Sequence, residues 1–283
     1  MFQVITNEMI VPNIHHLVVE APEVARAVKP GQFVILRAEE DGERIPLSIS
    51  DWDAEKGTLT ILFMNVGDTT NRLAAVKAGS AIPTVVGPLG MPTEMDNYGT
   101  VICVGGCYGI GSIFPIAREL KQRGNHVITV IEARSSYLVY WDKKLKQVSD
   151  TFYAITRDGS RGVRGHITHL PDIIAASKTP IARVIANGCT FLTKRVCDMT
   201  RPLGIKTIVS LNPIMIDGTG MCGVCRVTVG NERKFACVDG PDFDGHAVDW
   251  DELVQRRKSY LTEEVLPFHT SHCEEHAASH RRS

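Results

Sequence analysis

The sequence lacks any long apolar run, since no stretch approaches the roughly 18 to 20 residues that a membrane-spanning helix needs. It also lacks an excess of either charge, because 31 lysines and arginines stand against 32 aspartates and glutamates, and no basic block is available for nucleic acid. The first residues, MFQVITNEMIVPN, contain no apolar segment of the kind found in secretory signals. We therefore expect a cytoplasmic protein with no membrane span and no nucleic-acid partner.

What the sequence does have is enough apolar residues for a folded core and an uneven distribution of cysteines. Hydrophobic residues make up 43% of the 283 residues, which argues against disorder and leaves room for one large or two ordinary domains. Of the eight cysteines, Cys222, Cys225 and Cys237 fall within 16 residues. In the reducing compartment that we expect, such a group is more often a metal site than a set of disulfides.

Residues 1–96 are predicted to form a β-barrel. Short alternating or apolar runs recur there and are separated by glycine and proline. Several strands at this spacing are typical of a barrel or a sandwich, and one helix is expected over residues 70–77. The predicted strands are 2–6, 14–20, 32–38, 58–63 and 81–86.

Residues 97–211 are predicted to form an α/β domain with a parallel sheet. Apolar strands alternate here with helical stretches, and this alternation is typical of βαβ units. The predicted strands are 101–104, 127–131, 152–156, 181–186 and 206–210. The predicted helices are 112–123, 137–145, 166–176 and 191–200, and Pro115 is expected in the first turn of the first of them.

Residues 212–268 are predicted to form a third part, a subdomain that contains the cysteine cluster and a helix over residues 249–265. The apolar residues of that helix, among them Trp250 and Leu253, could dock onto a partner subunit or pack on their own chain. Residues 269–283 have no apolar period, and we expect them to form a disordered tail.

The three clustered cysteines have the spacing Cys222-x2-Cys225-x11-Cys237. Plant-type ferredoxins hold a [2Fe–2S] cluster with C-x4-C-x2-C and a distant fourth cysteine, and Asp217 stands where that pattern has its first cysteine. We therefore favour a [2Fe–2S] cluster whose ligands are Asp217, Cys222, Cys225 and Cys237. Two alternatives stay open, namely a zinc site made by the three cysteines with His246, and three cysteines that bind no metal.

A glycine-rich turn follows the first predicted strand of the α/β domain. Gly105, Gly106 and Gly109 lie between that strand and the next helix, where free N–H groups and the positive end of the helix suit a pyrophosphate. The pattern is not G-x-G-x-x-G, because Phe114 stands where the third glycine would be. Its position at the first strand–helix junction nevertheless predicts dinucleotide binding.

Residues at two further strand ends bear on the nucleotide. Glu132 suits the ribose 2′-hydroxyl of NAD, whereas Arg134 suits the 2′-phosphate of NADP, and Glu132 makes us favour NAD(H). Both residues could instead be solvated charges at the end of a loop. Gly188 and Cys189 lie at the edge where open α/β sheets bind ligands, although a free cysteine is more often simply buried.

A barrel followed by an α/β nucleotide domain resembles the ferredoxin–NADP reductase superfamily, and the added cluster loop resembles the electron-transfer subunit of dihydroorotate dehydrogenase. One subgroup is resembled closely, namely the small subunits of NADH-dependent reduced ferredoxin:NADP oxidoreductase, an electron-bifurcating transhydrogenase also named sulfide dehydrogenase beta subunit. An aspartate in place of the first cysteine belongs to that subgroup. The resemblance covers about residues 1–268 and rests on the runs 44–48 (RIPLS), 66–70 (VGDTT), 87–90 (GPLG), 209–222 (VSLNPIMIDGTGMC) and 235–241 (FACVDGP).

The resemblance implies that FAD lies against the barrel and NAD(H) on the α/β domain. Arg44 stands one residue before the arginine of the superfamily's R-x-Y-S-like motif, and Asn187 replaces the cysteine of its Cys-Gly-Pro-like motif. The residues that it implies for FAD are Arg44, Pro46, Leu47, Ser48, Leu62, Phe63, Met64, Thr69 and Thr70.

The implied function is transfer of a hydride between NAD(H) and the flavin, followed by passage of single electrons to the cluster and on to a large flavin and iron–sulfur subunit in a heterodimer. No catalytic acid or base is expected, since the redox chemistry belongs to the cofactors. One alternative is the electron-transfer subunit of a dihydroorotate or sulfide dehydrogenase with the same cofactors. Another is a zinc-stabilised nucleotide-binding regulatory module without electron transfer.

Overall fold

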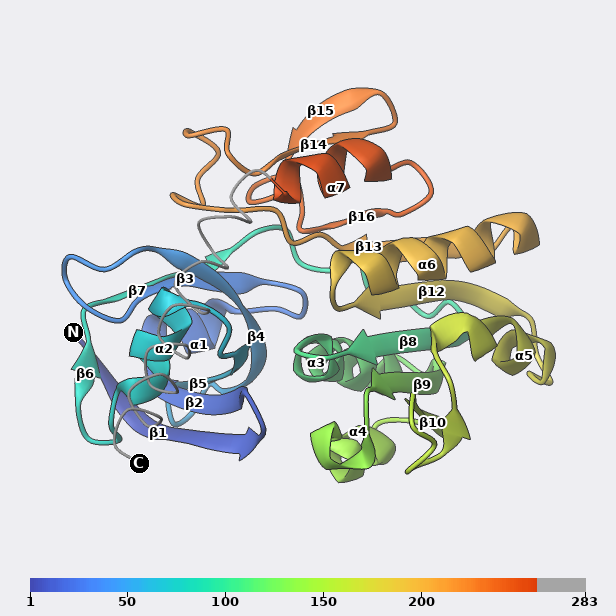
Figure 1. Ribbon diagram of the computed structural model, residues 1–283, viewed down its shortest axis with the longest axis horizontal. Coiled ribbons are helices and arrows are strands. Elements are labelled where there is room, and N and C mark those ends of the chain that lie inside the picture. The colour runs from blue at the N-terminus through green and yellow to red at the C-terminus, as the bar shows by residue number, and fades with distance from the viewer. Residues whose placement is uncertain (259–283) are drawn as a thin grey trace, which may run out of the picture.

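The computed structural model describes residues 1–258 and shows two seven-stranded sheets that lie side by side (Figure 1). The first is antiparallel, has the strand order β6-β1-β2-β5-β4-β3-β7 and curls into a half-barrel around its own apolar core, which confirms the predicted barrel. Its elements are β1 (Phe2–Val11), β2 (Ile14–Glu20), α1 (Pro22–Ala27), β3 (Phe33–Arg37), β4 (Ile45–Asp53), β5 (Thr58–Met64), α2 (Asp68–Ala75), β6 (Ala81–Ile82) and β7 (Thr84–Leu89).

The second sheet is parallel apart from one edge strand and has the order β11-β10-β9-β8-β12-β13-β16. It confirms the predicted α/β architecture. Its strands are β8 (Thr100–Gly106), β9 (His126–Ala133), β10 (Thr151–Thr156), β11 (Val163–Arg164), β12 (Ile181–Asn187), β13 (Lys206–Ser210) and β16 (Asp242–Asp244). Its helices are α3 (Gly109–Gln122), η1 (Ser136–Leu138), α4 (Asp142–Gln147), η2 (Ile167–His169), α5 (Leu170–Ala175), α6 (Thr190–Thr200) and η3 (Arg201–Leu203).

Alternate residues of β8 show how this sheet is covered on both faces. Val101 and Cys103 belong to the apolar cluster under α3 and α4, whereas Ile102 and Val104 belong to the cluster under α5 and α6. Every residue of β8 is buried, which explains its continuous apolar sequence. The carboxyl ends of β8 and β12 point toward the half-barrel, so the ligand-binding edge of the sheet faces the other domain (Figure 1).

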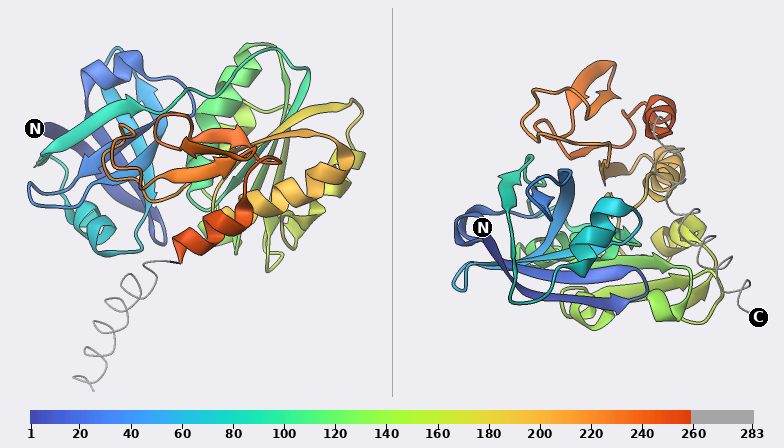
Figure 2. Two further views of the ribbon diagram at one scale, coloured as in Figure 1. Left: turned by 90° about the horizontal axis from the view of Figure 1, so that it is seen from above. Right: turned by 60° about the vertical axis from the view of Figure 1, so that its left-hand side comes forward.

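The C-terminal segment lies over the junction of the two sheets, as the views in Figure 2 show for the orange and red part of the chain. It consists of a hairpin, β14 (Arg226–Val229) with β15 (Glu232–Phe235), then the edge strand β16, and then α7 (Trp250–Arg257). It contacts the half-barrel as well, since the Met91 N–H donates to the Gly240 carbonyl at 2.6 Å.

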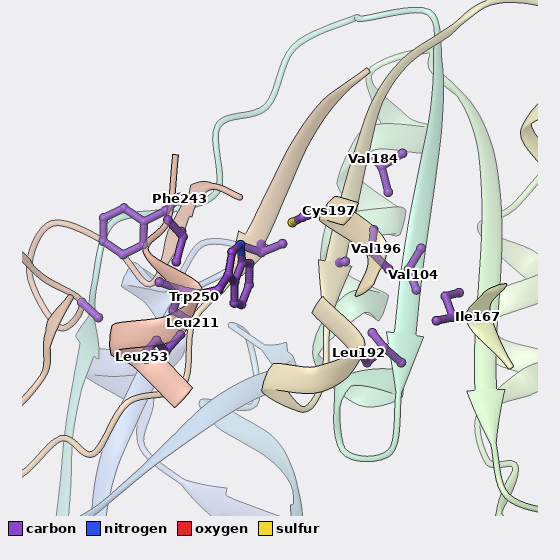
Figure 3. Packing of buried hydrophobic residues seen from close by; sticks show 14 of the residues in the cluster. Val104, Ile167, Val184, Leu192, Val196, Cys197, Leu211, Phe243, Trp250 and Leu253 are labelled. Carbon is purple, nitrogen blue, oxygen red and sulfur yellow. The ribbon is translucent and has the colours of Figure 1, made fainter. Parts of the chain in front are cut away.

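The described part of the predicted helix, α7, packs on its own chain. Trp250 and Leu253 are buried in the cluster that also contains Val196 and Cys197 of α6 (Figure 3). The Trp250 indole N–H donates to the Gly245 carbonyl at 2.9 Å. The rest of the predicted helix 249–265 and the predicted tail 269–283 lie outside the described residues.

Several sequence-based details are wrong, and three of them have a local reason. Residues 81–86 form two strands rather than one, because Pro83 cannot donate a hydrogen bond to a ladder. The predicted helix 137–145 is interrupted at Trp141, whose φ of 54° is left-handed. Pro115 lies in the interior of α3 rather than in its first turn, because the helix begins at Gly109.

Asp51 on β4 ties the half-barrel to helices α3 and α4. Its carboxylate accepts hydrogen bonds from Arg118, at 2.6 Å, and from Lys144. Burial alone would raise the pKa of Asp51, but the bond and charge of Lys144, followed by those of Arg118, hold it below its usual range. The Arg118 guanidinium also lies 5.0 Å from the centre of the Trp52 ring. This half-buried cluster fixes how the two domains meet.

Asp242 on β16 is a second polar residue at the junction, and its environment is the opposite of that of Asp51. Its Oδ2 accepts a hydrogen bond from the Thr93 hydroxyl at 2.5 Å, while its buried Oδ1 has no partner among the described residues. Burial raises the pKa of Asp242, and bonds from Thr93 and Ser210 offset this only in part. No cation among the described residues neutralises it.

Replacing Asp242 by asparagine is expected to stabilise the protein increasingly as pH rises. A pKa raised in the folded state means that the folded protein binds more protons, so the contribution of Asp242 is complete below its unfolded pKa of about 3.9 and is lost as pH rises through the folded value. The uncharged amide of the variant has no such loss. Apparent Tm values of both proteins, measured from about pH 4, near the unfolded pKa, up to about pH 8, test this. A difference that does not change with pH would contradict it.

None of the helices between residues 1 and 258 is both long enough and apolar enough to cross a membrane.

Candidate functional site

A cavity of about 340 Å³ lies between the half-barrel and the α/β sheet. One wall is formed by β4, β5 and the start of α2. The facing wall is formed by the ends of β12 and β13 and by Tyr108 in the glycine-rich turn. Most lining residues are apolar, with a few hydroxyl and amide groups such as those of Ser112 and Asn187. A pocket of this size and composition fits a planar aromatic ring such as that of a flavin.

Most residues implied for FAD line this cavity. Arg44 and Thr69 are not among the lining residues, because Arg44 is exposed just before β4 and the Thr69 hydroxyl donates to the Glu43 carboxylate at 2.8 Å. Thr70 lines the cavity and also accepts the Gly67 N–H at 3.0 Å, so it closes the first turn of α2 as well. The predicted residues that line the cavity are Pro46, Leu47, Ser48, Leu62, Phe63, Met64 and Thr70.

The glycine-rich turn brings the start of α3 against both walls. A Cβ atom on Gly109 would lie 2.1 Å from the Asn187 carbonyl oxygen, and one on Gly111 would lie 2.5 Å from the Leu62 side chain. Gly106 likewise lies against Leu192 of α6, and Gly105 against Ile110. The glycines therefore allow the close packing that places the N-terminus of α3 at the edge of the cavity.

Tyr108 and Asn212 connect the turn to the end of β13, and neither was predicted from the sequence as a site residue. The Tyr108 hydroxyl donates to the Gly188 carbonyl at 2.9 Å and accepts from the Asn212 amide. Arg257 of α7 donates to the Asn212 side-chain oxygen at 3.0 Å. Asn212 follows a strand at the carboxyl edge of the sheet, and that position was the available signal.

Glu132 and Arg134 lie in different environments at the end of β9. The Glu132 side chain is buried, accepts the Ile167 N–H at 2.8 Å and lies 3.5 Å from the Arg157 guanidinium. Arg134 is exposed. Glu132 thus holds a neighbouring loop in place, and its predicted contact with a ribose, like the preference for NAD over NADP, stays a prediction. Of the other predicted nucleotide residues, Gly188 lines the cavity and Cys189 is half-buried beside it.

Two of the four predicted cluster ligands have their ligating atoms in contact. The Asp217 carboxylate accepts the N–H groups of Thr219, at 2.9 Å, and of Cys222, at 2.7 Å, and these bonds lower its pKa. The sulfur atoms of Cys225 and Cys237 are buried 3.1 Å apart, too far for a disulfide. The bond from Cys222 to Asp217 is made by the backbone N–H of Cys222. A [2Fe–2S] cluster divides its ligands between two irons, and the thiol pair Cys225 and Cys237 suits one of them.

Other groupings of these residues fit a metal less well. Among residues 1–258 no three histidine, cysteine, aspartate or glutamate side chains are close enough together to hold a single ion. His246, the fourth ligand in the zinc alternative, instead has its ring nitrogen 3.0 Å from the Thr200 hydroxyl on α6. Burial, followed by the neighbouring Cys225, raises the pKa of Cys237, and a metal that binds here must displace the thiol proton.

Two arginines hold the backbone between Cys222 and Cys225. Arg226 donates to the Gly223 carbonyl at 3.3 Å, and Arg256 of α7 donates to the Val224 carbonyl at 2.9 Å. Their positive charges suit an anionic cluster in this loop. The spacing of the cysteines gave no sign of these arginines, because Arg256 reaches the loop only through the packing of α7.

Comparisons with known proteins agree with this geometry. Residues 212–249 match the family described as the iron–sulfur cluster binding domain of dihydroorotate dehydrogenase B. Over 268 residues the chain is 42% identical to a Thermotoga maritima protein named as a homolog of the electron transfer subunit of dihydroorotate dehydrogenase B (NAD(+)), with 94% of each chain covered. The chain belongs to the dihydroorotate dehydrogenase B electron-transfer subunit family. A member from Bacillus cereus is 30% identical and covers 85% of this chain and 94% of its own.

Solved structures place this electron-transfer subunit family member among ferredoxin reductase-like folds. A chain of the NADH-dependent reduced ferredoxin-NADP oxidoreductase, described as giving insight into flavin-based electron bifurcation, is 41% identical and superposes with a TM-score of 0.90 over 95% of this chain and 97% of that one. A Neisseria gonorrhoeae ferredoxin NADP+ reductase has a TM-score of 0.58 at 16% identity, covers 72% of this chain and 90% of its own, and shows the fold alone. The resemblance inferred from the sequence is confirmed.

Proposed function

We propose that this protein holds FAD and a [2Fe–2S] cluster, binds NAD(H), and passes electrons to a large flavin and iron–sulfur subunit, as in an electron-bifurcating NADH-dependent ferredoxin:NADP oxidoreductase. Its membership in a family of electron-transfer subunits supports the general role. The two cofactor sites and the identity of the large subunit are the specific parts of the proposal.

One observation supports the proposal most directly, namely that the loop with the proposed cluster ligands adjoins the cavity. Met215 lines the cavity, and Asp217, the first proposed cluster ligand, follows two residues later. A Cβ atom on Gly218 would lie 2.7 Å from the side chains of both Ile35 and Leu89 in the half-barrel, so the loop touches the flavin side directly. Electrons that leave the cavity therefore have a short path to the cluster.

Each part of the site would have its own task. The apolar cavity residues of β4 and β5 would hold the flavin ring away from water, and the Ser48 and Thr70 hydroxyls would offer it polar contacts. The N-terminus of α3 would hold the pyrophosphate of the nucleotide. A bound FAD would supply the exchange between two-electron hydride chemistry and single-electron transfer. The side chains would position the flavin and the nucleotide and would exclude water from them. None is assigned as an acid or base.

Exposed apolar residues around the cluster loop support a partner there. Ile216 is 48% and Met221 is 88% exposed, and Ile214 and Val238 are exposed nearby. Apolar side chains gathered beside a proposed electron-exit site fit the core of a protein–protein interface. The large subunit is proposed to cover them. The cytoplasmic location stays a prediction.

The purified protein is expected to show flavin absorption bands together with the broad absorption of an iron–sulfur cluster, and anaerobic NADH should bleach the flavin bands. A colourless, zinc-containing protein would contradict the proposal. Purification from its own cells, with mass spectrometry of the proteins that accompany it, identifies the partner. A large flavin and iron–sulfur subunit is the expected result, whereas a dihydroorotate dehydrogenase catalytic subunit would replace the bifurcating assignment.

A further inference from the structure

Two free cysteines lie at the carboxyl ends of neighbouring strands, beside the turn proposed to bind the nucleotide. β8 and β12 pair in parallel with Gly105 opposite Asn187. Two residues further along each chain come Cys107 and Cys189. Both thiols are free, Cys107 is exposed and Cys189 is half-buried. The register of the sheet thus brings together two cysteines that are 82 residues apart in the sequence.

The backbones that carry the two cysteines are in direct contact. A Cβ atom on Gly188 would lie 3.1 Å from the Gly106 carbonyl oxygen, so nothing separates the two segments just before the cysteines. Paired strands lie about 4.7–4.9 Å apart, so the strand ends that precede the cysteines are within the Cα separation of about 4.4–6.8 Å that a disulfide spans. The Tyr140 hydroxyl fixes the turn further by donating to the Cys107 carbonyl at 2.7 Å.

Cys107 has an unfavourable backbone conformation for a residue with a side chain. Cys107 has a left-handed φ of 53°, a conformation that glycine adopts freely and that other residues avoid. The preceding residue and the residue two positions later are both glycines, so the turn tolerates glycine on either side. A thiol held in a strained conformation next to a second thiol is the pattern expected when the thiol itself has a use.

The surroundings of Cys107 include the Cys189 thiol and two arginines. Burial, first of all, and then the nearby Cys189 raise the pKa of Cys107, while Arg157 and Arg134 act in the opposite direction. The Cys189 thiol is thus close enough to act on the Cys107 thiol.

We propose that Cys107 and Cys189 form a reversible disulfide that closes the nucleotide-binding turn to NAD(H). Two S–H bonds break and one S–S bond forms. The two electrons and two protons pass to a small oxidant, either a peroxide, which becomes water, or a low-molecular-weight disulfide, which becomes two thiols. The bridge crosses the edge of the sheet in front of the α3 N-terminus, where the pyrophosphate would enter. The regulatory part rests on the proposed function, because it assumes that the nucleotide binds at this turn.

Oxidised glutathione, applied to the complete protein under anaerobic conditions, tests this. Peptide mass spectrometry is expected to find Cys107 joined to Cys189, and the dissociation constant for NADH, measured by calorimetry, is expected to rise at least about ten-fold and to return with dithiothreitol. The absorption of the cluster monitors its integrity during the treatment. C107S and C189S, each compared with itself before and after oxidation, are expected to show no change.

Two results would overturn the proposal. One is the absence of the 107–189 link after oxidation, and the other is a link that forms while NADH affinity stays the same. C197S serves as a control, because Cys197 is buried in α6 and should leave the response to oxidation intact. A reduced protein that binds no NADH would contradict the proposed function and the closing of the turn, while peptide mapping would still decide whether the disulfide forms.

Discussion

Replacing Cys225 by serine is expected to remove the broad iron–sulfur absorption while the flavin bands and their bleaching by NADH remain. Cys225 is buried, and its sulfur lies 3.1 Å from that of Cys237, so the substitution removes one member of a proposed ligand pair. It is not among the residues that line the cavity. Absorption spectra with iron and sulfide analysis measure the loss, which should be nearly complete.

C197S is the matched control for this substitution, since Cys197 is also buried and free but belongs to α6. It should retain both chromophores. Loss of the flavin along with the cluster in C225S would show that the two sites are not separate, and circular dichroism would tell whether the whole fold had been lost. Retention of the cluster in C225S would contradict the ligand assignment.

Replacing Gly109 by alanine is expected to have the largest effect on NADH binding. The added Cβ would lie 2.1 Å from the Asn187 carbonyl oxygen and 2.6 Å from the Gly188 nitrogen, and backbone atoms cannot move aside as a flexible side chain can. The N-terminus of α3 must shift away from β12. We expect a loss of about 1–3 kcal/mol in the free energy of unfolding and a loss of NADH affinity of at least about ten-fold.

G67A is the control for G109A, because a Cβ atom on Gly67 meets no atom within 4 Å and its φ of −156° is ordinary extended backbone. Its effect on unfolding should be clearly smaller, and its NADH affinity unchanged. Denaturant unfolding and calorimetric titration of both variants make the comparison. Equal NADH affinity in G109A and the unsubstituted protein would exclude the turn as the nucleotide site.

Regular elements with a strong apolar pattern could be predicted from the sequence. Residues 14–20 and 206–210 were predicted as strands and are strands with those bounds, β2 and β13. Strand β4 was missed because it lines the cavity and ends near the Asp51 cluster, so its sequence, IPLSISDWD, carries polar residues and a proline. β4 is buried by contacts with the other domain, and the local sequence pattern holds no information about those contacts.

The residues of the site also divide into those that could be predicted from the sequence and those that could not. Cys222, Cys225 and the glycine turn were visible because their residues are close together in the sequence. The contacts of Asn212 and Arg256 were not visible, because they join segments that only the folded chain brings together. Glu132 shows the reverse case, since its spacing suggested a ribose contact whereas its carboxylate is already held by the Ile167 N–H.

Strand β16 has a consequence for how this protein could be divided. It lies beyond the cysteines in the sequence, yet it pairs with β13 along residues 208–210 and so completes the sheet of the nucleotide domain. A chain shortened before the cluster segment would expose the β13 edge, and unpaired strand edges recruit other chains into aggregates. The iron–sulfur segment therefore cannot be removed without exposing the edge of β13. A related protein without this segment would need another element to cover that edge.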